Sequence, residues 1–160
     1  MAKEKAPTTR AVRVLKEHGV SFILHLYTYE EHGGTEAAAK ALGVDEHRVV
    51  KTLVFEDDKG EPLLLLMHGD GQVSTTNLAR ILNVKTVRAC DPKVANKHTG
   101  YVVGGISPLG TRKRLRVYME RTILELPKLV INAGKRGLLA EMSPEDLLKL
   151  LNPTPVDVAI

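Results

Sequence analysis

Lys51 is the residue of this sequence whose surroundings most invite a chemical explanation. It lies in VVKTLVF, residues 49–55, a run that is otherwise apolar and typical of a strand. Alternation along the strand puts Lys51 on the same face as Val49 and Leu53. A lysine on such a face must reach solvent, pair with an anion, or have a lowered pKa. Two interpretations stay open: an edge-strand lysine whose ammonium reaches water, or a cation that serves a binding site.

A double glycine provides the second chemical signal. Gly104 and Gly105 follow two valines and precede Ile106-Ser107-Pro108. Without side chains, two such residues let peptide N–H groups approach a ligand closely, and the Ser107 hydroxyl adds a further donor. These donors suit a carboxylate, a phosphate or a developing oxyanion. A bulge or tight turn is the purely structural alternative.

Cations cluster near both glycine-rich segments. NAGKRG, residues 132–137, places Lys135 and Arg136 beside small residues, and the run 112–116 holds four further cations, Arg112, Lys113, Arg114 and Arg116. Guanidinium and ammonium groups beside glycine suit phosphate contacts. The net charge of +4 and the pI near 9.2 permit an anionic partner without requiring one. A solvated basic surface is the alternative.

Several site classes are excluded by missing motifs. The sequence contains no nucleotide-binding glycine fingerprint, no H-E-x-x-H or C-x-x-C pair and no G-x-S-x-G elbow, and its six histidines show no ligand spacing. Its single cysteine, Cys90, is expected to be a buried, inert thiol. We therefore expect no metal, no cofactor and no nucleophilic side chain. One cysteine, no signal peptide and no membrane span together predict a cytoplasmic protein.

The elements that position these residues alternate irregularly between strands and short helices. Strands are expected over 21–27, 48–56, 62–69, 86–90, 101–105, 114–123, 128–134 and 138–142, and helices over 8–19, 35–43, 74–84, 91–100 and 143–152. The segment 57–60 is expected to close a hairpin. We predict an α+β fold in which a mixed, barrel-like sheet of about seven strands is surrounded by short helices. Residues 1–8 are expected to form a flexible tail, and residues 9–160 a single domain.

Four segments together resemble the YbaK/EbsC family: FILHLY, VVKTLVF, TGYVVGGISPLGTRKR and NAGKRG. The best-known members of this family are Cys-tRNA(Pro)/Cys-tRNA(Cys) deacylases, which are related to the editing insertion domain of bacterial prolyl-tRNA synthetases. The similarity extends from about residue 10 to about residue 150. It implies hydrolysis of the ester that joins an amino acid to the 3′-terminal adenosine of tRNA, by a substrate-assisted route in which a cysteinyl thiol attacks its own carbonyl.

The resemblance also implies roles for individual residues. The family's essential lysine corresponds to Lys51 and its neighbour to Thr52, the pocket tyrosine to Tyr27, and the small polar residue before the G-K-R-G turn to Asn132, where serine is usual. The expected catalytic residues are Lys51, Gly104 and Gly105. The expected substrate-binding residues are Tyr27, Thr52, Ser107, Asn132 and Gly134. The expected tRNA-binding residues are Arg112, Lys113, Arg114, Lys135 and Arg136.

Two departures from the family pattern bear on substrate specificity. A family aspartate after G-K-R-G is Leu139 here, and Gly33 lies in HGGTE where the family often has an aromatic residue. Three functions therefore remain in competition. The first is hydrolysis of Cys-tRNA(Pro), the second is a non-catalytic module that binds tRNA, a nucleotide or prolyl-tRNA synthetase, and the third is a regulatory protein with an idle pocket.

Overall fold

The two longest strands, β2 (Val49–Asp57) and β3 (Pro62–His68), form the predicted hairpin at the centre of the sheet. Asp57 closes its turn, because the Oδ1 atom accepts hydrogen bonds from the N–H groups of Lys59 (2.9 Å) and Glu61 (3.0 Å). The five residues Leu63–Met67 have no solvent exposure at all. Burial on both faces requires a continuous apolar run, and β3 is therefore an interior strand with β2 and β5 on its two sides.

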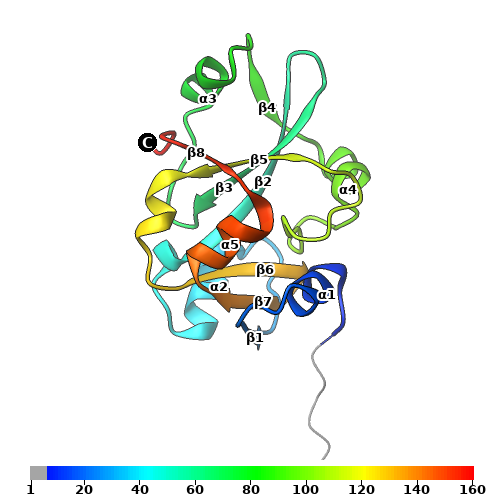
Figure 1. Ribbon diagram of the computed structural model, residues 1–160, viewed down its shortest axis with the longest axis vertical. Helices are drawn as coiled ribbons and strands as arrows, with labels where there is room; N and C mark the ends of the chain where they lie inside the picture. Colours follow the sequence, from blue (N-terminus) through cyan, green and yellow to red (C-terminus); the bar gives the residue numbers. More distant parts are fainter. Residues whose placement is uncertain (1–6) are drawn as a thin grey trace, which may run out of the picture.

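Eight strands form one mixed sheet in the computed structural model, which describes residues 7–160 (Figure 1). The other strands are β1 (Ile23–Leu26), β4 (Val87–Ala89), β5 (Arg116–Glu120), β6 (Leu129–Lys135), β7 (Leu138–Met142) and β8 (Thr154–Val156). Among these residues the pairing follows the open path β1-β7-β6-β2-β3-β5-β8, with β4 attached to β2. The pairs β2/β6, β3/β5 and β5/β8 are parallel and the others antiparallel. The predicted α+β class with a mixed sheet is confirmed.

Short helices cover the sheet, and hydroxyl side chains cap three of them. They are α1 (Arg10–Glu17), α2 (Gly34–Leu42), α3 (Thr75–Leu82), α4 (Pro92–Thr99) and α5 (Pro144–Leu151), with 3₁₀ helices η1 (Glu46–Arg48) and η2 (Arg121–Glu125). The side chains of Thr9, Ser74 and Ser143 accept hydrogen bonds from the first turns of α1, α3 and α5. None of the helices within residues 7–160 has the length and apolar composition needed to cross a bilayer.

Packing separates the helices into groups on different parts of the sheet. Ala11, Val12 and Leu15 of α1 and Leu147 of α5 pack with β6 and β7 in the largest core cluster. A second cluster joins α3 to β2, β3 and β8, and a third packs α2 against β2, β6 and β7. Figure 1 shows α1 and α5 near the β6–β7 hairpin and α3 at the opposite end. The hairpin β2–β3 therefore lies between the two larger cores.

Three sequence predictions about strands were wrong. Residues 101–105 form a turn, because Gly104 has a φ of 92° and the Gly105 N–H donates to Val102 O. The predicted strand 114–123 is shortened to β5, and its last residues form η2. The short strand β8 was missed, because a segment of three residues has no periodicity to detect. Of the predicted tail, residues 1–6 lie outside the described residues.

Glu120, at the end of β5, holds the C-terminal segment in place. Glu120 is 2% exposed, and its Oε1 atom accepts hydrogen bonds from the N–H groups of Val158 (2.9 Å) and Ala159 (3.1 Å). The other oxygen accepts from Thr122 N (3.1 Å) and Thr122 Oγ1 (2.7 Å). Burial raises the pKa of Glu120, but these hydrogen bonds outweigh it and hold the pKa below its usual value. The charged carboxylate therefore stabilises the fold.

We expect Glu120→Gln to lower the free energy of unfolding by about 2 kcal/mol at pH 7, because an amide cannot accept four hydrogen bonds. A pKa that is lower in the folded state gives stability above the unfolded value and loses it as the pH falls. The difference between the wild-type protein and the variant should therefore shrink below about pH 4. Urea unfolding between pH 3 and pH 7 measures it, with the exposed Glu125→Gln as control. A difference independent of pH would contradict the assignment.

Candidate active site

A cavity of about 450 Å³ opens where β2 loses its neighbour β6. The two strands pair only at Val49 and Val50, and β4 joins β2 only from Phe55 onward. Between these points Lys51 and Thr52 keep β3 as their only strand partner within residues 7–160. The loop 102–106 lies across this gap, with Val103, Gly104 and Ile106 in the cavity wall. The cavity therefore exists because two strands of one sheet diverge.

Lys51 lines this cavity with its ammonium group held by two carbonyls. Its Nζ atom donates to Gly71 O at 2.7 Å and to Gly69 O at 3.3 Å. An ammonium carries three donors, so one remains for a ligand. The side chain is half-buried, and a charge there is less screened than on an open surface. This geometry is that of a positioned cation and differs from a lysine that extends freely into water.

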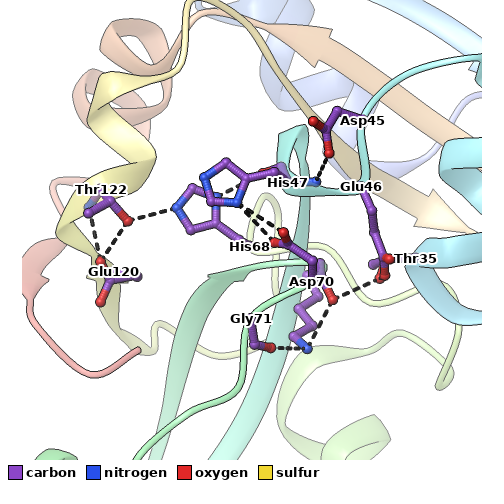
Figure 2. Close-up of polar contacts among 11 residues, drawn as sticks. Thr35, Asp45, Glu46, His47, His68, Asp70, Gly71, Glu120 and Thr122 are labelled. Carbon is purple, nitrogen blue, oxygen red and sulfur yellow. Dashed lines mark hydrogen bonds and ion pairs between the residues drawn. The ribbon is translucent and has the colours of Figure 1, made fainter. Parts of the chain in front are cut away.

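The turn that holds Lys51 is itself braced from several sides. Gly69 N–H donates to Val49 O, and a Cβ on Gly69 would lie 2.7 Å from Thr35 Oγ1, so this position has no room for a side chain. Thr35 donates to Glu46 at 2.7 Å (Figure 2). Because its neighbours are fixed in this way, the turn presents its carbonyls to Lys51 in one arrangement.

A stacked pair of histidines supports the same turn from the other side. The rings of His47 and His68 are 3.7 Å apart and nearly parallel, and His47 also contacts Asp70 at 2.9 Å (Figure 2). His68 is buried, with Nδ1 2.8 Å from His47 O and Nε2 2.7 Å from Thr122 Oγ1. The Thr122 hydroxyl continues to Glu120, so a chain of hydrogen bonds links the Lys51 turn to the C-terminal segment.

Gly104 and Gly105, adjacent in sequence, have different surroundings. Gly104 is exposed at the cavity wall, and its N–H has no hydrogen-bond partner within residues 7–160. Gly105 is buried, its N–H donates to Val102 O at 2.8 Å, and a Cβ on it would lie 2.8 Å from Arg136 N. The peptide donor expected from the pair is therefore available at Gly104 alone, while Gly105 lets the loop pack on the β6–β7 turn.

Asn132 connects that loop to β6. Its amide nitrogen donates to Gly104 O (3.2 Å) and Lys135 O (3.1 Å), and its Oδ1 accepts from Gly134 N (2.6 Å). The register between β6 and β7 shifts at this point. One side chain thus holds both the bulge in β6 and the position of Gly104. Asn132 also lines the cavity, as expected for a substrate-binding residue.

The cavity has an aromatic side and an apolar floor. Tyr27 and Tyr29 line one side. The pKa of Tyr27 is raised, mainly because the phenol is partly buried and to a smaller extent because Tyr29 lies nearby. Its phenol is therefore a neutral donor at physiological pH. Ala38, Val49 and Leu139 form one packed cluster at the wall, with Leu139 only 4% exposed. Leu139, which departs from the family pattern, thus extends the apolar floor.

The remaining predicted substrate-binding residues lie in different places. Thr52 lines the cavity, and its buried Oγ1 has no hydrogen-bond partner within residues 7–160. Ser107 is completely buried, and its hydroxyl accepts from Leu109 N at 3.2 Å, so it caps a turn outside the cavity. Gly134 faces away, because a Cβ on it would lie 2.8 Å from the Tyr101 ring. The structure therefore brings together Tyr27, Lys51, Thr52, Gly104 and Asn132, but not Ser107 or Gly134.

The predicted tRNA-binding cations are exposed but differ in their contacts. Lys135 and Arg136 form the β6–β7 turn, where Arg136 donates to Val103 O at 2.9 Å and lies 5.1 Å from the centre of the Tyr29 ring. Arg112, Lys113 and Arg114 lie in the loop before β5. Arg116, by contrast, is 3.6 Å from the buried carboxylate of Asp57. Arg112 and Arg114 can therefore contact a ligand, whereas the Lys113 Nζ atom lies 3.1 Å from His98 Nδ1 and Arg116 pairs with Asp57.

Several cavity residues escaped the sequence analysis, among them two with polar side chains. Tyr29 and His32 line the cavity mouth, and His32 adopts a left-handed φ of 62°. Both lie in a loop without periodicity, where the sequence analysis singled out only Gly33, as a departure from the family pattern. Cys90 does not line the cavity. Its pKa is raised to about 12, mainly by desolvation and to a smaller extent by the nearby Glu56 carboxylate. Its thiol therefore stays protonated, which agrees with the expected inert cysteine, but Cys90 is only partly buried and the prediction of a buried thiol was wrong.

Comparison with known proteins reveals related chains. A Cys-tRNA(Pro)/Cys-tRNA(Cys) deacylase by name, EbsC of Enterococcus faecalis, is 32% identical over 154 residues, covering 95% of this chain and 94% of the relative. The proline–tRNA ligase of Desulforamulus reducens is 30% identical over 63% of this chain, which corresponds to 17% of the ligase. A crystal structure described as a trans-editing enzyme for prolyl-tRNA synthetase superposes with a TM-score of 0.83 and 25% identity, covering 97% of this chain and 99% of the other.

The sequence profile of the aminoacyl-tRNA editing domain matches residues 30–150. This range includes all of the residues that line the cavity except Tyr27 and Tyr29. The resemblance predicted from the sequence is therefore confirmed over most of the chain. The chain belongs to the aminoacyl-tRNA editing domain family.

Proposed function

We propose that this protein hydrolyses the aminoacyl ester of mischarged tRNA, with Cys-tRNA(Pro), and also Cys-tRNA(Cys), as its substrate. Family membership gives the reaction class, and the name of the E. faecalis relative suggests the substrate. The observation that supports the proposal most is that one cavity is lined by Lys51 and by Gly104, whose N–H has no hydrogen-bond partner within residues 7–160. A cation and a peptide donor together suit the charge that develops on an ester carbonyl.

The cavity walls favour a small, uncharged acyl group. Ala38, Val49 and Leu139 offer no charge or hydrogen bond at the floor, so a charged side chain would lose its hydration there without compensation. A cysteinyl group is small and its thiol is only weakly polar. A synthetase discriminates poorly between amino acids of similar size, and a second hydrolytic site corrects the resulting error. Cysteine attached to tRNA(Pro) is an error of this kind.

The proposed reaction needs no nucleophile from the protein. The cysteinyl thiol loses its proton and its sulfur bonds to the acyl carbon, while the ester C–O bond breaks and the ribose oxygen takes up a proton. The products are free tRNA and a cysteine thiolactone, which water then opens. Gly104 N–H donates to the carbonyl oxygen as it gains negative charge, and Lys51 orients the carbonyl or the adenosine phosphate. Tyr27 and Thr52 shape the pocket around the acyl group.

Basic residues outside the cavity would hold the rest of the RNA. Lys135, Arg136 and the loop cations Arg112, Lys113 and Arg114 are exposed, and none forms an ion pair with a carboxylate within residues 7–160. Contacts with backbone phosphates depend on charge and not on sequence. Prolyl-tRNA synthetase is proposed as the source of the mischarged tRNA and as a partner of this protein.

We expect Lys51→Ala to lower the deacylation rate of Cys-tRNA(Pro) about 100- to 1,000-fold, the range for loss of one electrostatic contact in an active site. The measurement is amino acid release from Cys-, Ala- and Pro-charged tRNA(Pro), with Lys59→Ala in the exposed β2–β3 turn as control and thermal melting as a check of folding. Deacylation at the wild-type rate by a folded Lys51→Ala protein would show that Lys51 is misassigned. Wild-type protein that binds tRNA yet leaves every ester intact would favour the non-catalytic module.

Gly104→Ala is expected to reduce the rate constant kcat by about tenfold or more, through displacement of the peptide donor. The added Cβ would lie 2.5 Å from the Tyr29 hydroxyl oxygen, and the φ of 92° disfavours any side chain. The matched control is Gly19→Ala, which has a φ of 64° but nothing within 4 Å of the added carbon. Both variants introduce backbone strain, but only Gly104→Ala displaces the cavity wall. Equal losses of kcat in the two would refute a role for Gly104 in the chemistry.

A further inference from the structure

We infer that Arg10 and Arg112 form a two-arginine clamp for one backbone phosphate of the bound RNA. The inference rests on the proposed function and adds to it Arg10, which the sequence analysis did not select, as the partner of Arg112. Arg10 begins α1, and Arg112 lies in the loop before β5, 102 positions later in the sequence. The fold brings the two side chains to the same place beside Gly100, the residue that ends α4.

The side chains of Arg10 and Arg112 approach the same point beside Gly100. A Cβ on Gly100 would be 3.0 Å from Arg10 Nη1 and 3.6 Å from Arg112 Nε, so both nitrogens lie close to the same point. Both side chains are exposed, and within residues 7–160 neither forms an ion pair with a carboxylate or donates a hydrogen bond. Arg48, Arg116 and Arg121, in contrast, each have a carboxylate partner. Two adjacent cations without a counter-charge are suited to an anion.

The position of Arg10 in its helix also argues for an external partner. It is the first residue of α1, whose first turn contains no acidic residue. The helix macrodipole disfavours a positive charge at this end, so Arg10 is not located where it would stabilise α1. A phosphate between the two guanidinium groups would offset both the repulsion between them and the unfavourable interaction of Arg10 with the helix dipole. Each guanidinium can donate two parallel hydrogen bonds to phosphate oxygens.

The clamp is connected to the cavity through packed backbone. Gly105, at the cavity loop, packs on the backbone of Lys135 and Arg136. Thr9, the residue before Arg10, packs against Gly134 and donates to Ala133 O. Figure 1 shows α1 beside the β6–β7 hairpin and the loop that follows α4. An RNA strand that leaves the cavity past the exposed cations of the β6–β7 turn therefore reaches Arg10 and Arg112, which identifies the anion as a phosphodiester of RNA.

The test uses uncharged tRNA(Pro), so that binding is measured independently of hydrolysis. We expect Arg10→Gln and Arg112→Gln each to weaken binding about tenfold at low salt, because each removes charge-assisted hydrogen bonds. Since both arginines hold one phosphate, the slope of log K against log salt should decrease by only about 0.7 in the double variant, the value for a single lost phosphate contact on a single strand. Arg88→Gln, at an exposed arginine of β4, is the matched control and should bind like the wild type.

Kinetics separate this inference from the proposed function. With Cys-tRNA(Pro), the clamp variants should raise KM and leave kcat unchanged, and with 3′-cysteinyl-adenosine, which lacks the clamped phosphate, they should match the wild type. Wild-type affinity and salt slope in the double variant would overturn the clamp, as would a loss equal to that of Arg88→Gln. If the wild type hydrolyses no ester but the variants still lose tRNA affinity, the clamp stands and the proposed function fails.

Discussion

The divergence of β2 from β6 after Val50 is the constraint on which the rest of the site depends. If β6 continued to pair with β2 beyond Val50, the next residues of β2 would have a neighbouring strand on that side, and no cavity would form beside Lys51. The shift in register at Asn132–Lys135 accompanies this divergence, and the Asn132 amide satisfies the peptide groups that the bulge leaves without strand partners. The loop 102–106 then enters the gap. A defect in strand pairing thus creates the space in which a substrate can lie.

A second consequence is that the charge of Lys51 is held by backbone and not by a carboxylate. An acidic partner would neutralise the ammonium and weaken its attraction for a developing oxyanion, whereas carbonyl dipoles orient the ammonium and leave its net charge. This arrangement requires the turn 69–71 to hold the carbonyls of Gly69 and Gly71 in fixed positions. The stacked histidines, Thr35 with Glu46, and Glu120 with the C-terminal segment support that turn. Residues far from the cavity therefore contribute to the position of one nitrogen atom.

Local patterns account well for the elements that the sequence predicted correctly. The β2–β3 hairpin follows from two apolar runs around a turn with Asp57 and Gly60, and the helices expected over 8–19, 74–84 and 143–152 correspond to α1, α3 and α5. The failure at 101–105 has a specific cause: Val102 and Val103 have high strand propensity, but Gly104 and Gly105 demand a turn. Both valines are consequently about half exposed, at 52% and 45%. Propensity was overridden there by the geometry that the cavity wall requires.

The sequence by itself determined which chemical groups are available for binding and catalysis. An apolar strand with one lysine, a double glycine and a basic glycine-rich turn are local features, and short-range sterics and desolvation fix their meaning. Only the tertiary structure decided which of these groups meet. It brought Lys51, Gly104 and Asn132 to one cavity, consumed the Gly105 N–H in a turn, buried Ser107, and placed Arg10 beside Arg112. Such contacts join residues far apart in the sequence, and they depend on packing between elements, which spacing along the chain does not encode.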